Sequence, residues 1–90
     1  MTDDEFRARC TAEGWAEPRT MTYEPDQRPD LHTHDFDAMV LMLTGSMTLA
    51  SPEGDQPLTP GQVGLVPAGT VHSEHGGPQG GQALLATRQA

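Results

Sequence analysis

The chain has 90 residues, of which 34% are hydrophobic, and its formal net charge is −8. A chain this short buries a smaller share of its surface than an average domain, so we expect residues 1–90 to form one domain with one modest core. The five basic residues are scattered, which argues against partners such as nucleic acid or an anionic membrane. No segment approaches the ~20 continuous apolar residues that span a bilayer, and the first residues do not resemble a signal peptide. The single cysteine, Cys10, excludes an intramolecular disulfide, so we expect a soluble cytoplasmic protein.

Residues 1–15 predict one short helix followed by an anchoring tryptophan. Thr2 and Glu5 have the spacing of a capping box, and Gly14 is a residue type that commonly ends a helix. An isolated helix of this length is marginal in water, so it must dock on the rest of the chain. We expect Trp15 to pin it there.

Residues 18–88 have the pattern of an all-β barrel or sandwich. Alternation from Arg19 to Glu24 places Met21 and Tyr23 on one face of a strand. Further apolar or alternating segments, separated by turn residues, follow at 31–34, 38–43, 46–51, 63–66, 70–74 and 82–88. The turns include Thr44-Gly45 and the glycine-rich stretch at 76–81. About eight short strands with frequent turns are typical of all-β barrels.

Two histidines stand just before the most apolar segment. His32 and His34 are one residue apart, so in a strand both side chains point to the same face. The same alternation carries that face onward along the chain. The residues predicted to line a pocket there are Phe36, Ala38, Val40 and Met42.

The other face of this strand is apolar as well, because it carries Met39, Leu41 and Leu43. A strand that is hydrophobic on both faces is covered on both faces. From the residues alone, the cover is either the helix with Trp15 or a second subunit.

A second motif follows further along the chain. Gly61, Pro67, Gly69 and His72 match the pattern G-x5-P-x-G-x2-H, and earlier the pair of histidines is followed at the right distance by Gly45. Together these two motifs resemble those of a small single-domain cupin. The resemblance covers Arg19 to Arg88. It implies a cupin-type double-stranded β-helix, or jelly-roll barrel. Small cupins are commonly homodimers, so the resemblance favours a second subunit as the cover of the outer face.

The sequence departs from the cupin motifs at three positions. Asp26 stands where the first motif has glycine, and Gly76 where the second has asparagine. The usual glutamate ligand falls on Ala38, or on Met39 with the alternative spacing, and neither can bind a metal. The resemblance therefore implies a site reduced to three histidines.

The residues themselves agree with a metal site at His32, His34 and His72. Neutral imidazoles suit one divalent transition metal per chain, such as Fe, Zn, Ni, Mn or Cu. Three protein ligands leave coordination positions open, which is the layout of catalytic sites. Without a carboxylate the site is more cationic, which favours an anionic or chelating ligand.

Three nearby residues are candidates to replace the missing glutamate. Glu74 shares the parity of His72 and can enter the pocket. His75 enters only if Gly76 and Gly77 distort the strand, and Asp37 only through a β-bulge. For the two acids, Glu74 and Asp37, the alternatives are a solvated loop position or a hydrogen bond to the N–H of a ligand histidine.

The resemblance implies a metalloenzyme acting on a small polar or anionic metabolite. A three-histidine site without glutamate resembles that of thiol and diketone dioxygenases, and Lewis-acid chemistry of an isomerase or cyclase is equally compatible. The candidate acid–base groups are Tyr23, Glu74 and His75. The alternative is a non-catalytic ligand-binding or sensor cupin. Such a protein would not bind DNA itself, because the sequence has no helix-turn-helix.

Overall fold

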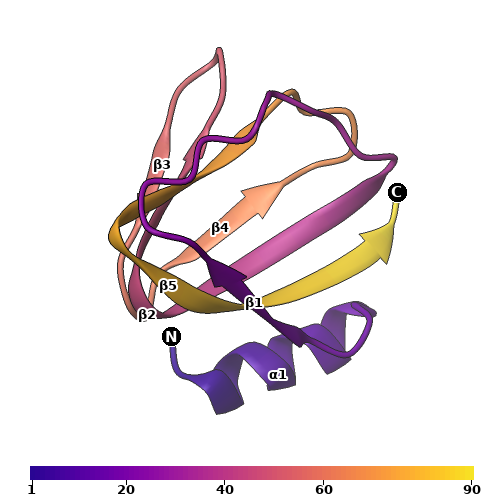
Figure 1. Ribbon diagram of the computed structural model, residues 1–90. Helices are drawn as coiled ribbons and strands as arrows, with labels where there is room; N and C mark the ends of the chain where they lie inside the picture. Colours follow the sequence, from indigo (N-terminus) through magenta and orange to yellow (C-terminus); the bar gives the residue numbers. More distant parts are fainter.

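The computed structural model describes residues 1–90 as one helix and five strands that curl into an open-sided barrel (Figure 1). The elements are α1 (Asp3–Glu13), β1 (Arg19–Tyr23), β2 (Phe36–Ala50), β3 (Gln56–Leu58), β4 (Val63–Val66) and β5 (Ser73–Gln89). The strand order is β1-β5-β2-β3, β4 also pairs with β2, and every pair is antiparallel. The predicted all-β class with one short helix is confirmed. That helix is neither long nor apolar enough to cross a membrane.

Two long strands replace most of the predicted short ones. β2 has 15 residues and β5 has 17, and they pair along nearly their whole length. The predicted turns at Thr44-Gly45 and at 76–81 are therefore wrong. The chain does not reverse at Gly45; the pairing shifts register on either side of it, between Met42 and Thr44 and between Gly45 and Met47. Such irregularities bend a strand without ending it.

The glycines at this bend allow a close approach between backbones. Gly45 has a φ of 70°, and a Cβ atom there would lie 2.0 Å from the carbonyl oxygen of Gly80. A Cβ on Gly81 would lie 2.3 Å from the carbonyl oxygen of Thr44. The glycine-rich stretch is thus part of a bent strand pressed against its neighbour, which a sequence pattern does not distinguish from a turn.

β2 is buried on both faces, as its composition predicts. Ala38, Val40 and Met42 point into the barrel, and Met39 and Leu41 point outward. The inner cluster is completed by Tyr23, Met47, Leu49, Leu58, Val66 and Ala83. The outer cluster is completed by Phe6, Cys10, Trp15, Leu84 and Ala86. The chain itself therefore supplies the outer cover through α1 and Trp15, and a homodimer stays a prediction.

The helix begins and ends where its sequence predicts. Thr2 and Glu5 form both hydrogen bonds of a capping box, and Gly14 ends the helix with a φ of 77°. Trp15 then turns back onto the barrel. Its Nε1 donates to Glu13 at 3.0 Å, and the Arg88 guanidinium lies 4.2 Å from the centre of its ring. These contacts join the helix to β5.

Candidate metal centre

An isolated antiparallel bridge between His32 and His72 builds the base of the site. The His32 N–H donates to the His72 carbonyl at 2.9 Å, and the His72 N–H donates to the His32 carbonyl at 3.0 Å. Residues paired in this way carry their side chains on the same face, and the two ring centres are 4.5 Å apart. The predicted strand at 31–34 is thus reduced to a single bridge, which still aligns the two imidazoles.

His34 completes the group of three imidazoles. Its ring centre is 5.0 Å from that of His32 and 5.2 Å from that of His72. Its other side stacks on Phe36, with ring centres 4.7 Å apart and an interplanar angle of 16°. Burial lowers the pKa of His34, and the neighbouring imidazoles of His72 and His32 lower it further. The neutral form, which is the metal-binding form, is therefore favoured.

Hydrogen bonds to carbonyl groups fix the tautomers of two imidazoles. His32 Nδ1 lies 2.9 Å from the Asp30 carbonyl oxygen, and His72 Nδ1 lies 2.8 Å from the Thr70 carbonyl oxygen. A carbonyl oxygen only accepts, so each Nδ1 carries the hydrogen and each Nε2 presents a lone pair. Metal-ligating histidines use this arrangement to hold the ring in place.

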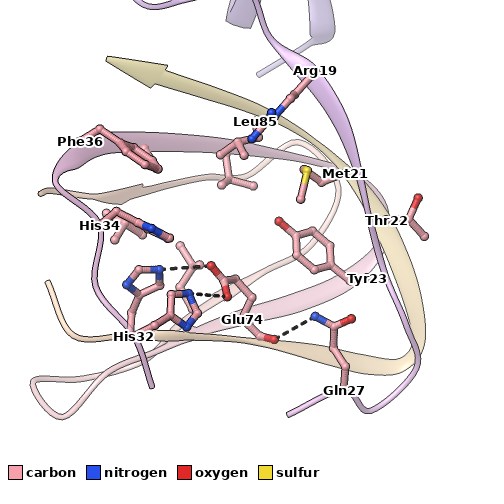
Figure 2. A pocket seen from close by; sticks show the side chains of 15 residues that line it. Arg19, Met21, Thr22, Tyr23, Gln27, His32, His34, Phe36, Glu74 and Leu85 are labelled. Carbon is pink, nitrogen blue, oxygen red and sulfur yellow. Dashed lines mark hydrogen bonds and ion pairs between the residues drawn. The ribbon is translucent and has the colours of Figure 1, made fainter. Parts of the chain in front are cut away.

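The lone pairs of both Nε2 atoms face the carboxylate of Glu74 (Figure 2). His32 Nε2 is 3.3 Å from one carboxylate oxygen, and His72 Nε2 is 3.2 Å from the other. Three electron-pair donors face one another here, so the group needs a cation between them, either a proton or a metal ion. Ligands about 2.1 Å from a common ion lie roughly 3 Å apart, so the donor set fits a metal.

Glu74 brings into the centre the carboxylate that position 38 lacks. One ligand atom from each of His32, His34, His72 and Glu74 lies within 4.8 Å of all the others. Ala38 lines the same cavity from β2, whereas Glu74 enters from β5, two residues after His72. Of the three candidates to replace the missing glutamate, Glu74 is therefore the one whose carboxylate lies among the three histidines.

The other two candidates for a fourth ligand do not reach the site. His75 is paired opposite Thr48 and lines a separate surface hollow with Asp26 and Arg28. Asp37 accepts a hydrogen bond from the Ala68 N–H at 2.9 Å, and the regular pairing of β2 around it contains no bulge. Strand parity holds at both positions, so both side chains stay outside the barrel.

Asp26, which stands where the first motif has glycine, adopts a left-handed backbone conformation that glycine favours. Its φ is 56°, and it is the one non-glycine residue of the chain with a positive φ. Aspartate is among the few residue types that tolerate this conformation. The departure from the motif at this position thus leaves the loop before His32 able to turn.

A cavity of about 270 Å³ opens beside the four ligand candidates. Phe36, Ala38 and Val40 line it as predicted from parity. Met42 does not. It is fully buried beside Gly81, because the bend of β2 carries it past the end of the cavity. The polar residues that also line the cavity are Arg19, Thr22, Tyr23 and Gln27, and the further apolar ones are Met21, Leu49, Val66 and Leu85.

Of the acid–base candidates other than Glu74, Tyr23 lines the cavity and His75 does not. Burial raises the pKa of Tyr23 to about 12, and the charge of Glu74 adds to this effect. The phenol therefore stays protonated in the neutral range. Nearby, Gln27 donates from Nε2 to the Glu74 carbonyl at 3.3 Å and thereby ties the loop before the histidines to β5 (Figure 2).

Sequence reasoning missed Arg19 and Gln27 as residues of the site. Arg19 could have been found, because it shares the parity of Met21 and Tyr23 in an alternating strand. Gln27 lies in a loop whose path no periodicity predicts.

Comparison with solved structures identifies the architecture. A cupin superfamily protein from Desulfitobacterium hafniense superposes with a TM-score of 0.71 at 19% identity, over 82% of this chain and 67% of that one. The chain has the cupin fold. A cupin-2 domain protein from Shewanella frigidimarina gives a TM-score of 0.67 at 17% identity, over 78% of this chain and 67% of that one.

A further match is a protein of unknown function from Rhizobium leguminosarum. It has a TM-score of 0.76 at 18% identity, over 82% of this chain and 70% of that one. No family model and no curated protein matches the sequence. Identities this low establish the fold alone, so the function rests on the site of this chain.

Proposed function

We propose that this cupin-fold chain binds one divalent transition metal at His32, His34, His72 and Glu74 and uses it to act on a small molecule. The proposal rests on one observation: imidazole nitrogens and the Glu74 carboxylate, all electron-pair donors, face one another at the mouth of the barrel. Their ligand atoms all lie within 4.8 Å, and backbone carbonyls hold two of the imidazoles with Nε2 directed inward.

The chemistry that fits best is that of a Lewis-acid isomerase or cyclase. A divalent metal bound there would polarise an oxygen of the substrate. Glu74 reduces the positive charge of the centre by one unit, which weakens the likeness to the carboxylate-free dioxygenase site. Dioxygenase-like chemistry is therefore the second candidate, supported by the three histidines alone.

The residues of the cavity have complementary tasks in such a reaction. Tyr23 presents a protonated phenol, which can donate a hydrogen bond to a substrate oxygen. Phe36 stacks on His34 and limits the positions that its ring can occupy. Val40 and Leu85 give the cavity apolar walls, and these exclude water from the substrate.

The test is the metal content of purified protein prepared without chelators. We expect close to one equivalent of a divalent transition metal per chain, lost in His72→Ala. The matched control is His75→Ala, because His75 is the one histidine outside the group and should be dispensable. Substoichiometric metal in the unaltered protein, or equal metal in both variants, would refute the proposal. Oxygen uptake with candidate substrates then separates the dioxygenase from the Lewis-acid reaction.

A further inference from the structure

Arg19 is the one basic side chain of the protein without a partner in the chain. Arg7 pairs with Asp3 and Arg9 with Glu13 on the exposed surface of α1. The other two basic side chains are also engaged: Arg28 donates to the carbonyl oxygens of Gln27 and Gly76, and Arg88 pairs with Asp37. The Arg19 guanidinium makes no hydrogen bond or ion pair, although the protein has 13 acidic residues and five basic ones. Arg19 is exposed, so its unpaired guanidinium is free to bind an anionic ligand from outside the chain.

Arg19 lies at the edge of the cavity that contains the proposed metal ligands. It is paired opposite Leu85 across β1 and β5, and its guanidinium end lies over that residue (Figure 2). Met21 and Tyr23 follow it along the same face of β1 and lead from the edge towards Glu74 (Figure 2). The cavity thus has a cationic edge, an apolar middle and a metal-binding end.

Charge and volume restrict the ligand further. A guanidinium binds a carboxylate with two parallel hydrogen bonds, and one such group with no cluster of backbone N–H donors suits a single carboxylate better than a doubly charged phosphate. A divalent metal beside Glu74 keeps one net positive charge, so the inner end also suits an oxygen donor that is anionic. At roughly 30 Å³ per water-sized group, the volume of 270 Å³ holds about nine such groups.

We propose that Arg19 binds the carboxylate of a small acid whose other end bears an oxygen donor for the metal, with a short apolar chain between them. This inference rests on the proposed metal site. It assigns Arg19 as the residue that selects ligands with a carboxylate at the end away from the metal.

The test compares adipate with hexanoate by calorimetric titration of the metal-loaded protein. Each compound can place one carboxylate on the metal, and only adipate has a second for Arg19. We expect adipate to bind about five- to tenfold more tightly than hexanoate, and this advantage to vanish in Arg19→Gln while hexanoate binding stays the same. Arg19→Lys should keep part of the advantage. The same titration with 5-phosphonopentanoate, which is adipate with one carboxylate replaced by a phosphonate, tests whether Arg19 prefers a carboxylate or a phosphonate.

Arg7→Gln is the matched control, because it removes the same charge from a surface helix far from the cavity. Equal binding of adipate and hexanoate to the unaltered protein overturns the inference. So does an advantage that survives in Arg19→Gln, or one that Arg7→Gln abolishes equally. Metal content is measured on every sample. Loss of metal in the unaltered protein marks failure of the proposed metal site, whereas full metal without dependence on Arg19 marks failure of this inference alone.

Discussion

His32 and His72 lie directly opposite each other in an antiparallel bridge that belongs to neither long strand. Their two backbone hydrogen bonds hold the start of the first motif against the end of the second. The carbonyls of Asp30 and Thr70 then orient the rings from equivalent positions, each two residues earlier in the chain. Backbone groups therefore hold both histidines. The carboxylate, in contrast, depends only on which position of the chain carries a glutamate.

The first prediction concerns the position of that carboxylate. Glu74→Gln should weaken metal binding about tenfold or more, because it removes the one charged donor facing the imidazoles. Adding Ala38→Glu to this variant should restore much of the affinity, because position 38 lines the same cavity from β2. Competition with a chromophoric chelator measures both.

Glu24→Gln is the control for that pair, since it removes an exposed carboxylate that is not one of the four ligand candidates. Metal affinity in Glu74→Gln equal to that of the unaltered protein would show that Glu74 is not a ligand. Failure of Ala38→Glu to restore affinity would show that the two positions are not equivalent.

Strand parity predicted most of this site from the sequence. It placed His32 and His34 on one face, Phe36, Ala38 and Val40 along the cavity, and Glu74 beside His72. Parity depends only on the extended backbone, so it survives errors in strand length.

What the sequence could not give depends on contacts between distant segments. Gly45 and the stretch at 76–81 were predicted to be turns. Glycine permits a tight turn, but it also permits a close approach of two backbones, and a single sequence does not distinguish these two roles. The prediction that Met42 lines the cavity failed because the bend of β2, which the sequence does not reveal, begins directly after this residue. The choice of α1 over a second subunit as the outer cover also depended on where a helix docks, which its own residues do not encode.

The pKa of Tyr23 should lie well above that of an ordinary tyrosine. It is the one tyrosine of the chain, so the near-ultraviolet absorbance of tyrosinate reports on it alone. In protein freed of metal by a chelator we expect a pKa of about 12 in the folded state, raised from 10.0 by burial and then by Glu74. A titration midpoint at the ordinary value in folded protein would place the phenol in solvent instead.

The same shift makes stability depend on pH in the alkaline range. The folded-state pKa of Tyr23 is raised, so its contribution is complete below pH 10 and is lost as the pH rises towards 12. The loss should reach about 2–3 kcal/mol in the free energy of unfolding. Urea unfolding at a series of pH values measures it, and Tyr23→Phe should remove this part of the dependence.

Phe6 should contribute strongly to stability, because it is fully buried between α1 and the outer face of the barrel. Phe6→Ala is expected to lower the free energy of unfolding by roughly 3–5 kcal/mol. Thr2→Ala, which removes only the helix cap, should cost about 1 kcal/mol. Urea unfolding compares the two. A cost for Phe6→Ala no larger than that of the cap would mean that α1 does not cover Met39 and Leu41, and would favour a second subunit in that place.

The bend that shapes the cavity can be tested at Gly45. Gly45 and Gly14 both have a positive φ, of 70° and 77°, so alanine is strained by its backbone at either position. They differ in their surroundings: a Cβ at Gly14 meets nothing within 4 Å, whereas a Cβ at Gly45 meets the backbone of Gly80 and Gly81. Gly14→Ala should therefore cost about 1–2 kcal/mol in the free energy of unfolding, from the strained φ alone.

Gly45→Ala should cost distinctly more than Gly14→Ala, because β2 and β5 must also move apart. Both long strands lead into the metal centre, so their separation should reach the ligands as well. We expect Gly45→Ala to lower metal affinity and Gly14→Ala to leave it unchanged, measured by chelator competition on the folded fraction. Equal destabilisation by the two substitutions would mean that the strands are not pressed together at Gly45, and that the bend has another cause.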